Sequence, residues 1–458
     1  MAVTTTDAPA STSTTRPASL AADDVRRIVH PYTPTESRER FIIESGSGCR
    51  VRDVDGREYL DGIGGLGLSQ IGHGRTEIAE AAAAQMKRLE FFHSRWNFSN
   101  DRAIELASRL GEIAPEGLDH VYFTSGGAEG NDIALRMARY FHYRNGEPER
   151  TWFLARNMAY HGITYGSGSV TGSAEYHEGF GPMLPNVKFL TAPYPYKRHF
   201  FHGEDPTEFC LRELRETIEE IGPEHIAAMI GEPIMGPGGV LIPPPDYWPR
   251  VAEVLRSYGI LLISDEIVTG YGRLGRWFGA EHVGVTPDIL VTAKGLTSGY
   301  VPHGAVLLNS RVAEAIGRDS GFPIGYTYNG HPTACAVALA NLDIIEREGL
   351  VRNAEVVGNY LGDQLRALLD LPAVGEVRQL GLMMAVELVS DKETREPLPQ
   401  GTSPVADRIR EESGVLVRGN PNSFVLTPPL VLTEAEADEA AEGVRSVLRR
   451  LRPDGTIE

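Results

Sequence analysis

The sequence has little cysteine, no excess of positive charge and no long apolar run. Its 458 residues include only Cys49, Cys210 and Cys335, which lie far apart in no metal-like spacing. An odd, dispersed set of cysteines disfavours a disulfide framework and is typical of the reducing cytoplasm. His199 and His202 have the spacing of a metal pair, but we interpret them as solvated loop histidines and expect no metal site.

Charge and hydropathy exclude further classes of partner. The formal net charge of −18 disfavours nucleic acid and anionic membrane surfaces. No stretch approaches the roughly 20 apolar residues that a membrane-spanning helix needs. Residues 1–20 are rich in Ser, Thr, Pro and Ala without the hydrophobic segment of a signal peptide, so we expect a disordered tail there and a cytoplasmic protein. Asp23 and Asp24 predict a helix over Ala21–His30, because acidic residues favour helix N-termini.

Two short apolar runs near the middle of the chain predict buried strands. Tyr258–Ser264 stops at Asp265, and Pro287–Ala293 stops at Lys294. Runs of this length without polar alternation are typical of parallel strands buried on both faces of a sheet. In such sheets ligands bind beyond the carboxyl ends of the strands. We therefore expect Asp265 and Lys294 to point into one crevice.

A lysine and a carboxylate in one crevice form a chemically useful pair. Burial disfavours the charged form of lysine, so its pKa falls and the amine becomes a nucleophile toward a carbonyl. Pyridoxal phosphate (PLP) needs this combination, a Schiff-base lysine and an acid on the pyridinium nitrogen. The alternative is that Asp265 and Lys294 form an ordinary ion pair at a sheet edge.

Glycine-rich segments indicate close backbone contacts. The run SGGAEGN at Ser125–Asn131 follows a predicted strand over His120–Thr124 and precedes a predicted helix over Asp132–Tyr143. Strand, glycine-rich loop and helix start form a cradle of backbone N–H groups for an anion such as a phosphate. The run is not a Walker loop, because no Gly-Lys-Ser/Thr follows. Gly62–Leu68 is too glycine-rich for a regular element and indicates either backbone near a ligand or a flexible loop.

Four motifs occur in an order that resembles a known family. They are GEPIMGPGGV at 231–240, LLISDEIVTGYGRLGRWFG at 261–279, TAKGLTSGYVPHGAV at 292–306 and YTYNGHP at 326–332. Together they resemble the class III, fold-type I, PLP-dependent aminotransferases, and within these the ω-amine:pyruvate transaminases. The resemblance extends from about residue 25 to the C-terminus.

The resemblance implies an α/β fold with two domains. We expect a large domain built on a mostly parallel sheet and a smaller α/β domain formed by the N- and C-terminal parts. The expected division is a tail at 1–20, the N-terminal segment of the small domain at 21–80, the large PLP-binding domain at 81–335 and the C-terminal part of the small domain at 336–458. The length suits two or more domains of roughly 100–200 residues each.

The resemblance also implies the cofactor-binding residues. They are Gly126, Gly127, Ala128, Tyr160, His161, Glu232, Asp265, Val268, Lys294 and Thr327. In the family Tyr160 stacks on one face of the pyridine ring and Val268 packs on the other. Ala128 stands where a Ser is usual, so one hydrogen bond to the phosphate, worth on the order of 1 kcal/mol, is missing. Thr327 reaches the phosphate of the neighbouring subunit, which implies a homodimer with a shared active site.

The implied substrate pocket contains Arg418, Gly67, Phe92 and Trp96. Arg418 stands where ω-amine:pyruvate enzymes carry a movable arginine that grips a substrate carboxylate, which a guanidinium can do with two N–H groups. The alternative is an ordinary surface arginine. Gly67 stands where the family often has Trp, so we expect a wider pocket with room for a bulky donor.

The implied reaction is a ping-pong transamination from a primary (ω-)amine or amino acid to a 2-oxo acid, which we expect to be pyruvate. Lys294 moves the proton at the donor Cα, and Asp265 keeps the ring nitrogen protonated. Pro237 and Leu426 stand where the ornithine-aminotransferase-like branch has a Glu and an Arg, which argues against that branch. The alternatives are a 2-oxoglutarate-linked class III aminotransferase, a PLP aminomutase or decarboxylase on the same scaffold, and a non-enzymatic PLP-binding protein.

Overall fold

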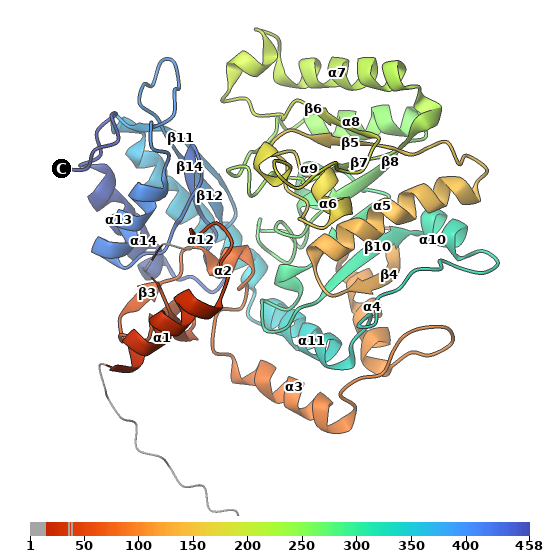
Figure 1. The fold of residues 1–458 in the computed structure, drawn as a ribbon, viewed down its shortest axis with the longest axis horizontal. Coiled ribbons are helices and arrows are strands. Elements are labelled where there is room, and N and C mark those ends of the chain that lie inside the picture. The colour runs from red at the N-terminus through yellow and green to blue at the C-terminus, as the bar shows by residue number, and fades with distance from the viewer. Residues whose placement is uncertain (1–14, 35–36, 38–39) are drawn as a thin grey trace, which may run out of the picture.

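The structure is a computed structural model that describes residues 15–34, 37 and 40–458. At its centre lies a seven-stranded sheet in the order β4-β10-β9-β8-β7-β5-β6 (Figure 1). The strands are β4 (Leu118–Thr124), β5 (Trp152–Arg156), β6 (Val187–Leu190), β7 (Ile226–Gly231), β8 (Leu261–Asp265), β9 (Ile289–Thr292) and β10 (Gly304–Asn309). Strand β10 runs antiparallel to both its neighbours, and the other pairs are parallel. The predicted α/β fold with a mostly parallel sheet is confirmed.

Helices cover both faces of this sheet because both faces are apolar. Along β8, Leu261 and Ile263 pack into one core cluster with α5 and α10, whereas Leu262 packs into another with α7 and α8. These helices are α5 (Gly127–Arg144), α7 (Pro206–Ile221), α8 (Tyr247–Ser257) and α10 (Ser310–Gly317). Every residue of β7, β8 and β9 is buried, as the two apolar runs predicted for β8 and β9.

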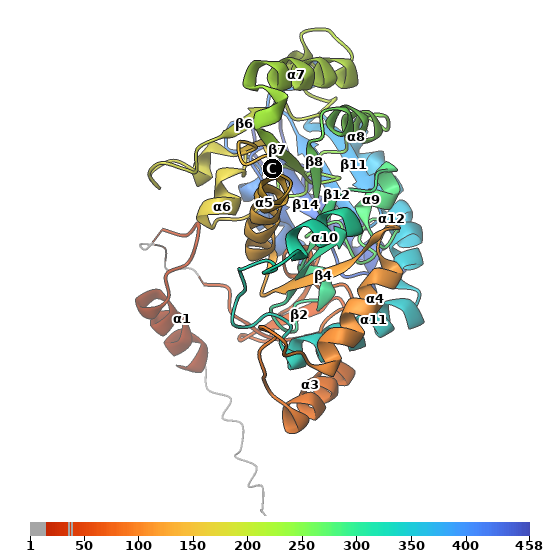
Figure 2. The ribbon, with the colours of Figure 1, turned by 90° about the vertical axis from the view of Figure 1, so that its right-hand side faces the viewer.

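Further helices pack beside the β4 edge of the sheet. Helix α4 (Asp101–Ile113) packs on β4, and α11 (Pro332–Arg347) packs on both α4 and α3 (Thr76–Arg88). Figures 1 and 2 place α3 at one end of the molecule and α7 at the opposite end. Two short helices, α6 (Tyr165–Ser169) and α9 (Gly279–Val283), lie in connections of the central sheet.

The N- and C-terminal parts of the chain lie side by side (Figure 1). Strands β1 (Ile43–Ser47), β2 (Arg50–Asp53) and β3 (Glu58–Leu60) form one antiparallel sheet, and β11 (Val374–Leu380), β12 (Met383–Leu388), β14 (Ser423–Leu426) and β13 (Arg418–Gly419) form another in that order. Leu60 connects the two parts, because its N–H donates to Gly414 O and its carbonyl accepts from Leu416 N, both at 2.9 Å. Helices α12 (Leu350–Arg366) and α13 (Ser403–Ser413) pack on the second sheet, and α14 (Glu434–Leu448) packs on both helices. The domain bounds at residues 80 and 335 stay predictions.

The start of the described chain differs from the prediction. Helix α1 spans Thr15–Arg27, so it begins before Asp23, and residues 15–20 of the expected disordered tail are helical. Pro17 is tolerated because it lies in the first turn, and Ala, Leu and Arg among the following residues are good helix formers. The rest of the expected tail, residues 1–14, lies outside the described residues.

The glycine-rich segment after β3 forms a single left-handed turn, α2 (Gly64–Gly67). Gly64, Gly65, Leu66 and Gly67 have φ values of 51°, 56°, 79° and 72°. Only glycine visits this region without strain, so the backbone accounts for the three glycines, whereas Leu66 adopts the same region as a strained residue. At Gly64 there is no room either, because a Cβ there would lie 2.3 Å from the carbonyl oxygen of Thr427.

Candidate active site

Asp265 lies at the carboxyl end of β8 and is 3% exposed. Its Oδ2 is hydrogen-bonded to Asn131 Nδ2 and to His161 Nδ1, both at 2.7 Å. Its Oδ1 accepts from the backbone N–H of Ile267 at 3.1 Å. These three partners satisfy a buried carboxylate and fix its orientation.

Asn131 is a site residue that the sequence analysis did not single out. It is fully buried, and its Nδ2 donates both to Asp265 and to the backbone carbonyl of His161 at 2.7 Å. One amide group therefore holds the carboxylate and its histidine neighbour together. The only signal in the sequence is its place at the end of the SGGAEGN run.

That glycine-rich run is the N-terminus of α5 and not a loop before it. The helix begins at Gly127, so the expected start at Asp132 is wrong. Glycine is an acceptable N-cap and an acidic residue suits the first turn, and here Gly126 and Glu129 take these two places. The first-turn N–H groups, including those of Gly127 and Ala128, have no partners inside the helix. Apart from its two chain neighbours, no described residue has an atom within 4 Å of the place of a Cβ on Gly126, so this helix end has room for an anion.

Lys294 follows β9 and is partly buried. Its φ of 43° lies in the left-handed region, a strained conformation that clusters at functional sites. Burial, helped by the positive charge of Arg418 and opposed by the negative charge of Asp265, lowers the pKa of Lys294 to about 8. Among the described residues its amine forms no hydrogen bond or ion pair. The alternative of an ordinary Asp265–Lys294 ion pair is therefore wrong.

Glu232 links two segments at the carboxyl ends of β5 and β7. Its Oε1 accepts from the backbone N–H of Tyr160 at 3.1 Å, and its Oε2 accepts from that of Gly236 at 2.8 Å. Burial raises the pKa of Glu232. The Tyr160 ring contacts the Tyr176 ring edge-on, with centroids 5.2 Å apart.

One cavity brings together four of the predicted site residues, Lys294, Val268, Gly67 and Arg418. It is also lined by Ile63, Leu66, Gly236, Pro237, Met383, Val425 and Thr427. The lining comes from segments that follow β7, β8 and β9 of the central sheet, from the turn α2 that follows β3, and from the second small sheet. The cavity thus lies where the three parts of the chain meet.

Arg418 lies at the start of β13 and is partly buried, so the reading as a surface arginine is wrong. Burial lowers the pKa of Arg418, and neighbouring tyrosine side chains oppose this shift. Its Nη2 donates to the Pro237 carbonyl at 3.4 Å, and its buried Nε has no partner in the described part of the chain. The guanidinium therefore has unused donors close to the cavity.

Three of the predicted site residues lie on the surface of the chain, away from the cavity. Trp96 is 83% exposed and Phe92 is 41% exposed, and Thr327 is exposed as well. Their two segments contact each other, because Ser94 Oγ donates to Asn329 O at 2.9 Å. None of the three lines the cavity that contains Lys294.

The residues present fit PLP. The buried carboxylate of Asp265 and the free amine of Lys294 lie at and just after the carboxyl ends of the neighbouring strands β8 and β9, and the helix N-terminus at Gly127 offers backbone N–H groups to a phosphate. His161 Nε2 and Asn131 Oδ1 are buried beside Asp265 without partners among the described residues. Fold and site together define the class of PLP-dependent fold-type I enzymes.

The particular family follows from comparison with known proteins. The sequence model of the aminotransferase class-III family matches residues 32–448, so the chain belongs to this family. Among curated relatives it is 37% identical to the putrescine–pyruvate aminotransferase of Pseudomonas aeruginosa, with 91% of this chain and 92% of the relative covered. It is 38% identical to the diaminobutyrate–2-oxoglutarate transaminase of Halomonas elongata, again with 91% and 92% covered.

Solved structures give the same result. The chain is 46% identical to an (S)-enantioselective ω-transaminase from Thermomicrobium roseum, with a TM-score of 0.89 over 93% of this chain and 97% of the other. It is 43% identical to an amine transaminase from an uncultivated Pseudomonas species in its PLP-bound form, with a TM-score of 0.88 over 92% and 97%. The protein is thus a PLP-dependent transaminase that moves an amino group from an amine donor to a 2-oxo acid.

No helix among the described residues is long and apolar enough to cross a membrane. Within the same part of the chain, no group of three His, Cys, Asp or Glu side chains is placed to hold a metal ion.

Proposed function

We propose that this chain is an amine:pyruvate transaminase in which Lys294 carries PLP. When bound, PLP withdraws electrons from the Cα–H bond of the donor amine. The Lys294 amine, with its pKa lowered to about 8, takes the proton from the donor Cα and returns one when the acceptor reacts. A pKa near the working pH allows the same group to act as base and as acid.

Asp265 is proposed to hold the proton on the pyridine nitrogen. The carboxylate is held in one orientation, because Asn131 and His161 both bond its Oδ2. Asn131 therefore acts as a positioning residue for Asp265. On the two ring faces we propose Tyr160 and Val268.

The phosphate of PLP is proposed to bind the N-terminus of α5 through the backbone N–H groups of Gly126, Gly127 and Ala128. Helix α5 has 18 residues and a positive N-terminal dipole, which favours a negatively charged group. Glu232 is proposed to hold the segments of Tyr160 and Gly236 around the cofactor, since its carboxylate bonds both backbones.

Pyruvate as the acceptor rests on Arg418. This arginine lines the cavity of Lys294, and within the described part of the chain its buried Nε has no partner and its Nη2 makes one long hydrogen bond. A substrate carboxylate would therefore bind the guanidinium more strongly than the Pro237 carbonyl does. The putrescine–pyruvate relative supports this acceptor. The diaminobutyrate–2-oxoglutarate relative, at similar identity, supports 2-oxoglutarate as the second candidate. Gly67 leaves the cavity wall without a side chain, which favours a bulky donor.

A homodimer with a shared active site is part of the proposal. Thr327, Phe92 and Trp96 are exposed in one chain, as residues would be that complete the site of a partner subunit. We also propose that residues 21–80 and 336–458 form the small domain around the large domain at 81–335, and that the protein is cytoplasmic.

The half-reaction of the PLP-loaded protein tests this function. Alanine and amines without a carboxylate should convert the bound cofactor to its amine form, whereas glutamate should not. Rapid conversion by glutamate with little response to simple amines would favour the 2-oxoglutarate-linked alternative and remove the role of Arg418. Release of carbon dioxide, or an amine shift without an external acceptor, would instead indicate a decarboxylase or an aminomutase.

A further inference from the structure

We propose that Arg378 is a positioning residue for recognition of the substrate carboxylate. It holds the loop at residues 236–240, and this loop determines where the guanidinium of Arg418 rests. The inference depends on the proposed function of Arg418 and adds a residue that does not line the cavity.

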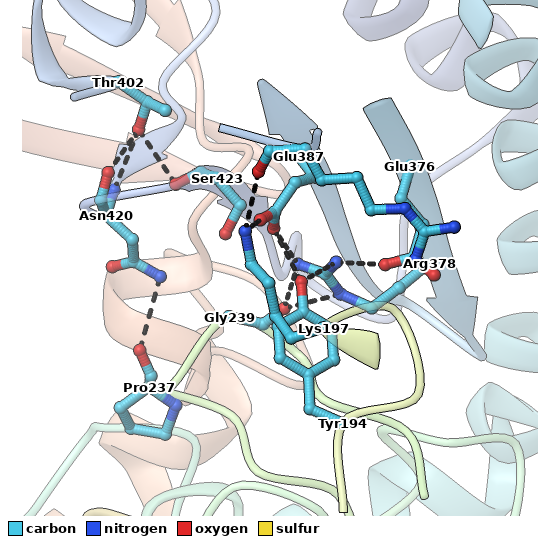
Figure 3. A network of polar contacts seen from close by, with 11 residues as sticks. Tyr194, Lys197, Pro237, Gly239, Glu376, Arg378, Glu387, Thr402, Asn420 and Ser423 are labelled. Atoms are coloured by element: carbon cyan, nitrogen blue, oxygen red, sulfur yellow. Dashed lines mark hydrogen bonds and ion pairs between the residues drawn. The ribbon is translucent and has the colours of Figure 1, made fainter. Parts of the chain in front are cut away.

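Arg378 lies on β11 and is 6% exposed. Its Nε and Nη2 both donate to the carbonyl oxygen of Gly239, at 3.0 Å and 2.8 Å. Figure 3 shows this fork reaching from the small sheet to the loop that follows β7. A planar guanidinium fixes an acceptor with two bonds from one rigid group, which an ammonium cannot do.

Neighbouring groups hold the fork in place. Arg378 Nη2 donates to Glu387 Oε2 at 2.9 Å, and Nη1 donates to Tyr194 OH at 2.7 Å. Tyr194 OH in turn donates to Glu387 Oε2 at 2.9 Å, and Lys197 Nζ lies 3.4 Å from Glu387 Oε1 (Figure 3). Buried charges are retained only where they are paired and hydrogen-bonded, so the arginine has little freedom to move.

The loop transmits this restraint to the cavity. Gly236 is bound at one end by Glu232, and Gly239 is bound at the other by Arg378. Between them, the Pro237 carbonyl accepts from Arg418 Nη2 at 3.4 Å and from Asn420 Nδ2 at 3.3 Å. Because Gly239 N also bonds Gly236 O at 3.0 Å, the loop is a tight turn and a shift at Gly239 moves the Pro237 carbonyl.

The test compares two donors, alanine and 1-phenylethylamine, in Arg378→Lys. Lysine keeps a positive charge opposite Glu387 but lacks the fork. In the half-reaction of the PLP-loaded protein, with no 2-oxo acid present, we expect KM for alanine to rise about tenfold, which corresponds to about 1.4 kcal/mol, with the maximal rate of cofactor conversion little changed. The rate with 1-phenylethylamine, which has no carboxylate, should stay within about twofold. An equal loss for both donors would indicate a merely structural role and overturn the inference.

Tyr194→Phe is the matched control. It removes two hydrogen bonds from the same buried network but leaves both bonds from Arg378 to Gly239. Its ratio of alanine to 1-phenylethylamine activity should equal that of the unchanged protein, and a selective loss here would also overturn the inference.

Two further variants keep the test decisive. If Arg378→Lys does not fold, Gly239→Ala displaces the same carbonyl from the loop side, because its φ is 113° and a Cβ would lie 3.0 Å from Ser423 Oγ. The same selective rise in KM is expected, and its absence counts against the inference. Arg418→Ala distinguishes a failure of the proposed role of Arg418 from a failure of the inferred role of Arg378. If it spares alanine, the proposed role of Arg418 fails and the inference with it; if it impairs alanine selectively while Arg378→Lys does not, only the inference fails.

Discussion

At the scale of single residues, the site depends on a lysine that is costly to bury. Lys294 has a strained backbone, no polar partner among the described residues and a pKa lowered to about 8 from an ordinary 10.5. Natural proteins accept such a loss of stability where function requires it. The cost should be measurable in the protein without its cofactor, because the amine is then free.

Lys294→Met should abolish turnover and stabilise the cofactor-free protein at pH 7. Below pH 8 both folded and unfolded chains carry the protonated lysine, and its burial costs the folded state on the order of 3 kcal/mol. Between pH 8 and 10.5 the unfolded chain binds more protons, so the wild-type free energy of unfolding rises with pH. The advantage of the variant should therefore shrink across this window. Denaturant unfolding at pH 7 and pH 10 measures the difference in free energy of unfolding between the variant and the unchanged protein. A difference that grows with pH would contradict the lowered pKa of Lys294.

At the scale of elements, two backbone features build the site, the left-handed turn α2 and the N-terminus of α5. Neither is visible in the hydrophobic pattern. Both depend on glycines. Glycine is needed there not only for its backbone freedom but also because neighbouring atoms leave no room for a side chain. Gly127 is an example, because a Cβ there would lie 2.6 Å from Ile267 Cδ1.

Gly64→Ala should destabilise the protein far more than Gly48→Ala. Their φ values are 51° and 56°, so the backbone cost of about 1–2 kcal/mol is shared. Only Gly64 adds a steric conflict, since its Cβ would meet Thr427 O at 2.3 Å, whereas nothing lies within 4 Å at Gly48. Thermal unfolding of the two variants measures the difference, and equal losses would mean that α2 can move away from Thr427.

Ala128→Ser should tighten PLP binding by about fivefold, because a hydroxyl in the first turn of α5 adds one hydrogen bond of about 1 kcal/mol to the phosphate. Titration of the cofactor-free protein with PLP measures the dissociation constant. Ala128→Cys is the control, since a thiol of similar size is a weak donor and should leave the affinity near that of the unchanged protein. A serine variant no tighter than the cysteine variant would place the phosphate elsewhere.

At the scale of the whole molecule, one chain leaves part of its predicted site on its surface. Thr327 and Trp96 lie away from the Lys294 cavity, in two segments that contact each other. A partner subunit would bring these segments to the phosphate end of the site. The mass in solution should then be twice the 50.0 kDa of the chain.

Subunit mixing tests whether the active site is shared. Lys294→Ala is inactive by itself, and Thr327→Glu should be inactive because it sets a carboxylate against the phosphate. In a mixed dimer one site combines an intact Lys294 with an intact Thr327 from the other chain. Refolding the two together should restore about a quarter of the unchanged activity, since half of the dimers carry one complete site. Mixed dimers without activity would contradict a shared site.

Local sequence pattern was enough to predict two buried parallel strands, β8 and β9, that end at or just before Asp265 and Lys294. These are local properties, because a strand buried on both faces needs an unbroken apolar run and its end is marked by the first polar residues. The family motifs added the cofactor and the reaction class. They could not show how the residues are held.

The side chains that support the site became visible only in the folded chain. Asn131 meets Asp265 although 134 residues separate them, and Arg378 reaches Gly239 across 139 residues. Such contacts depend on how α5 and β11 pack against distant segments, and no local pattern records that packing. The left-handed turn at Gly64 and the start of α5 at Gly127 could not be predicted for a related reason. A glycine allows several backbone conformations, and only the residues packed around it determine which of them it adopts.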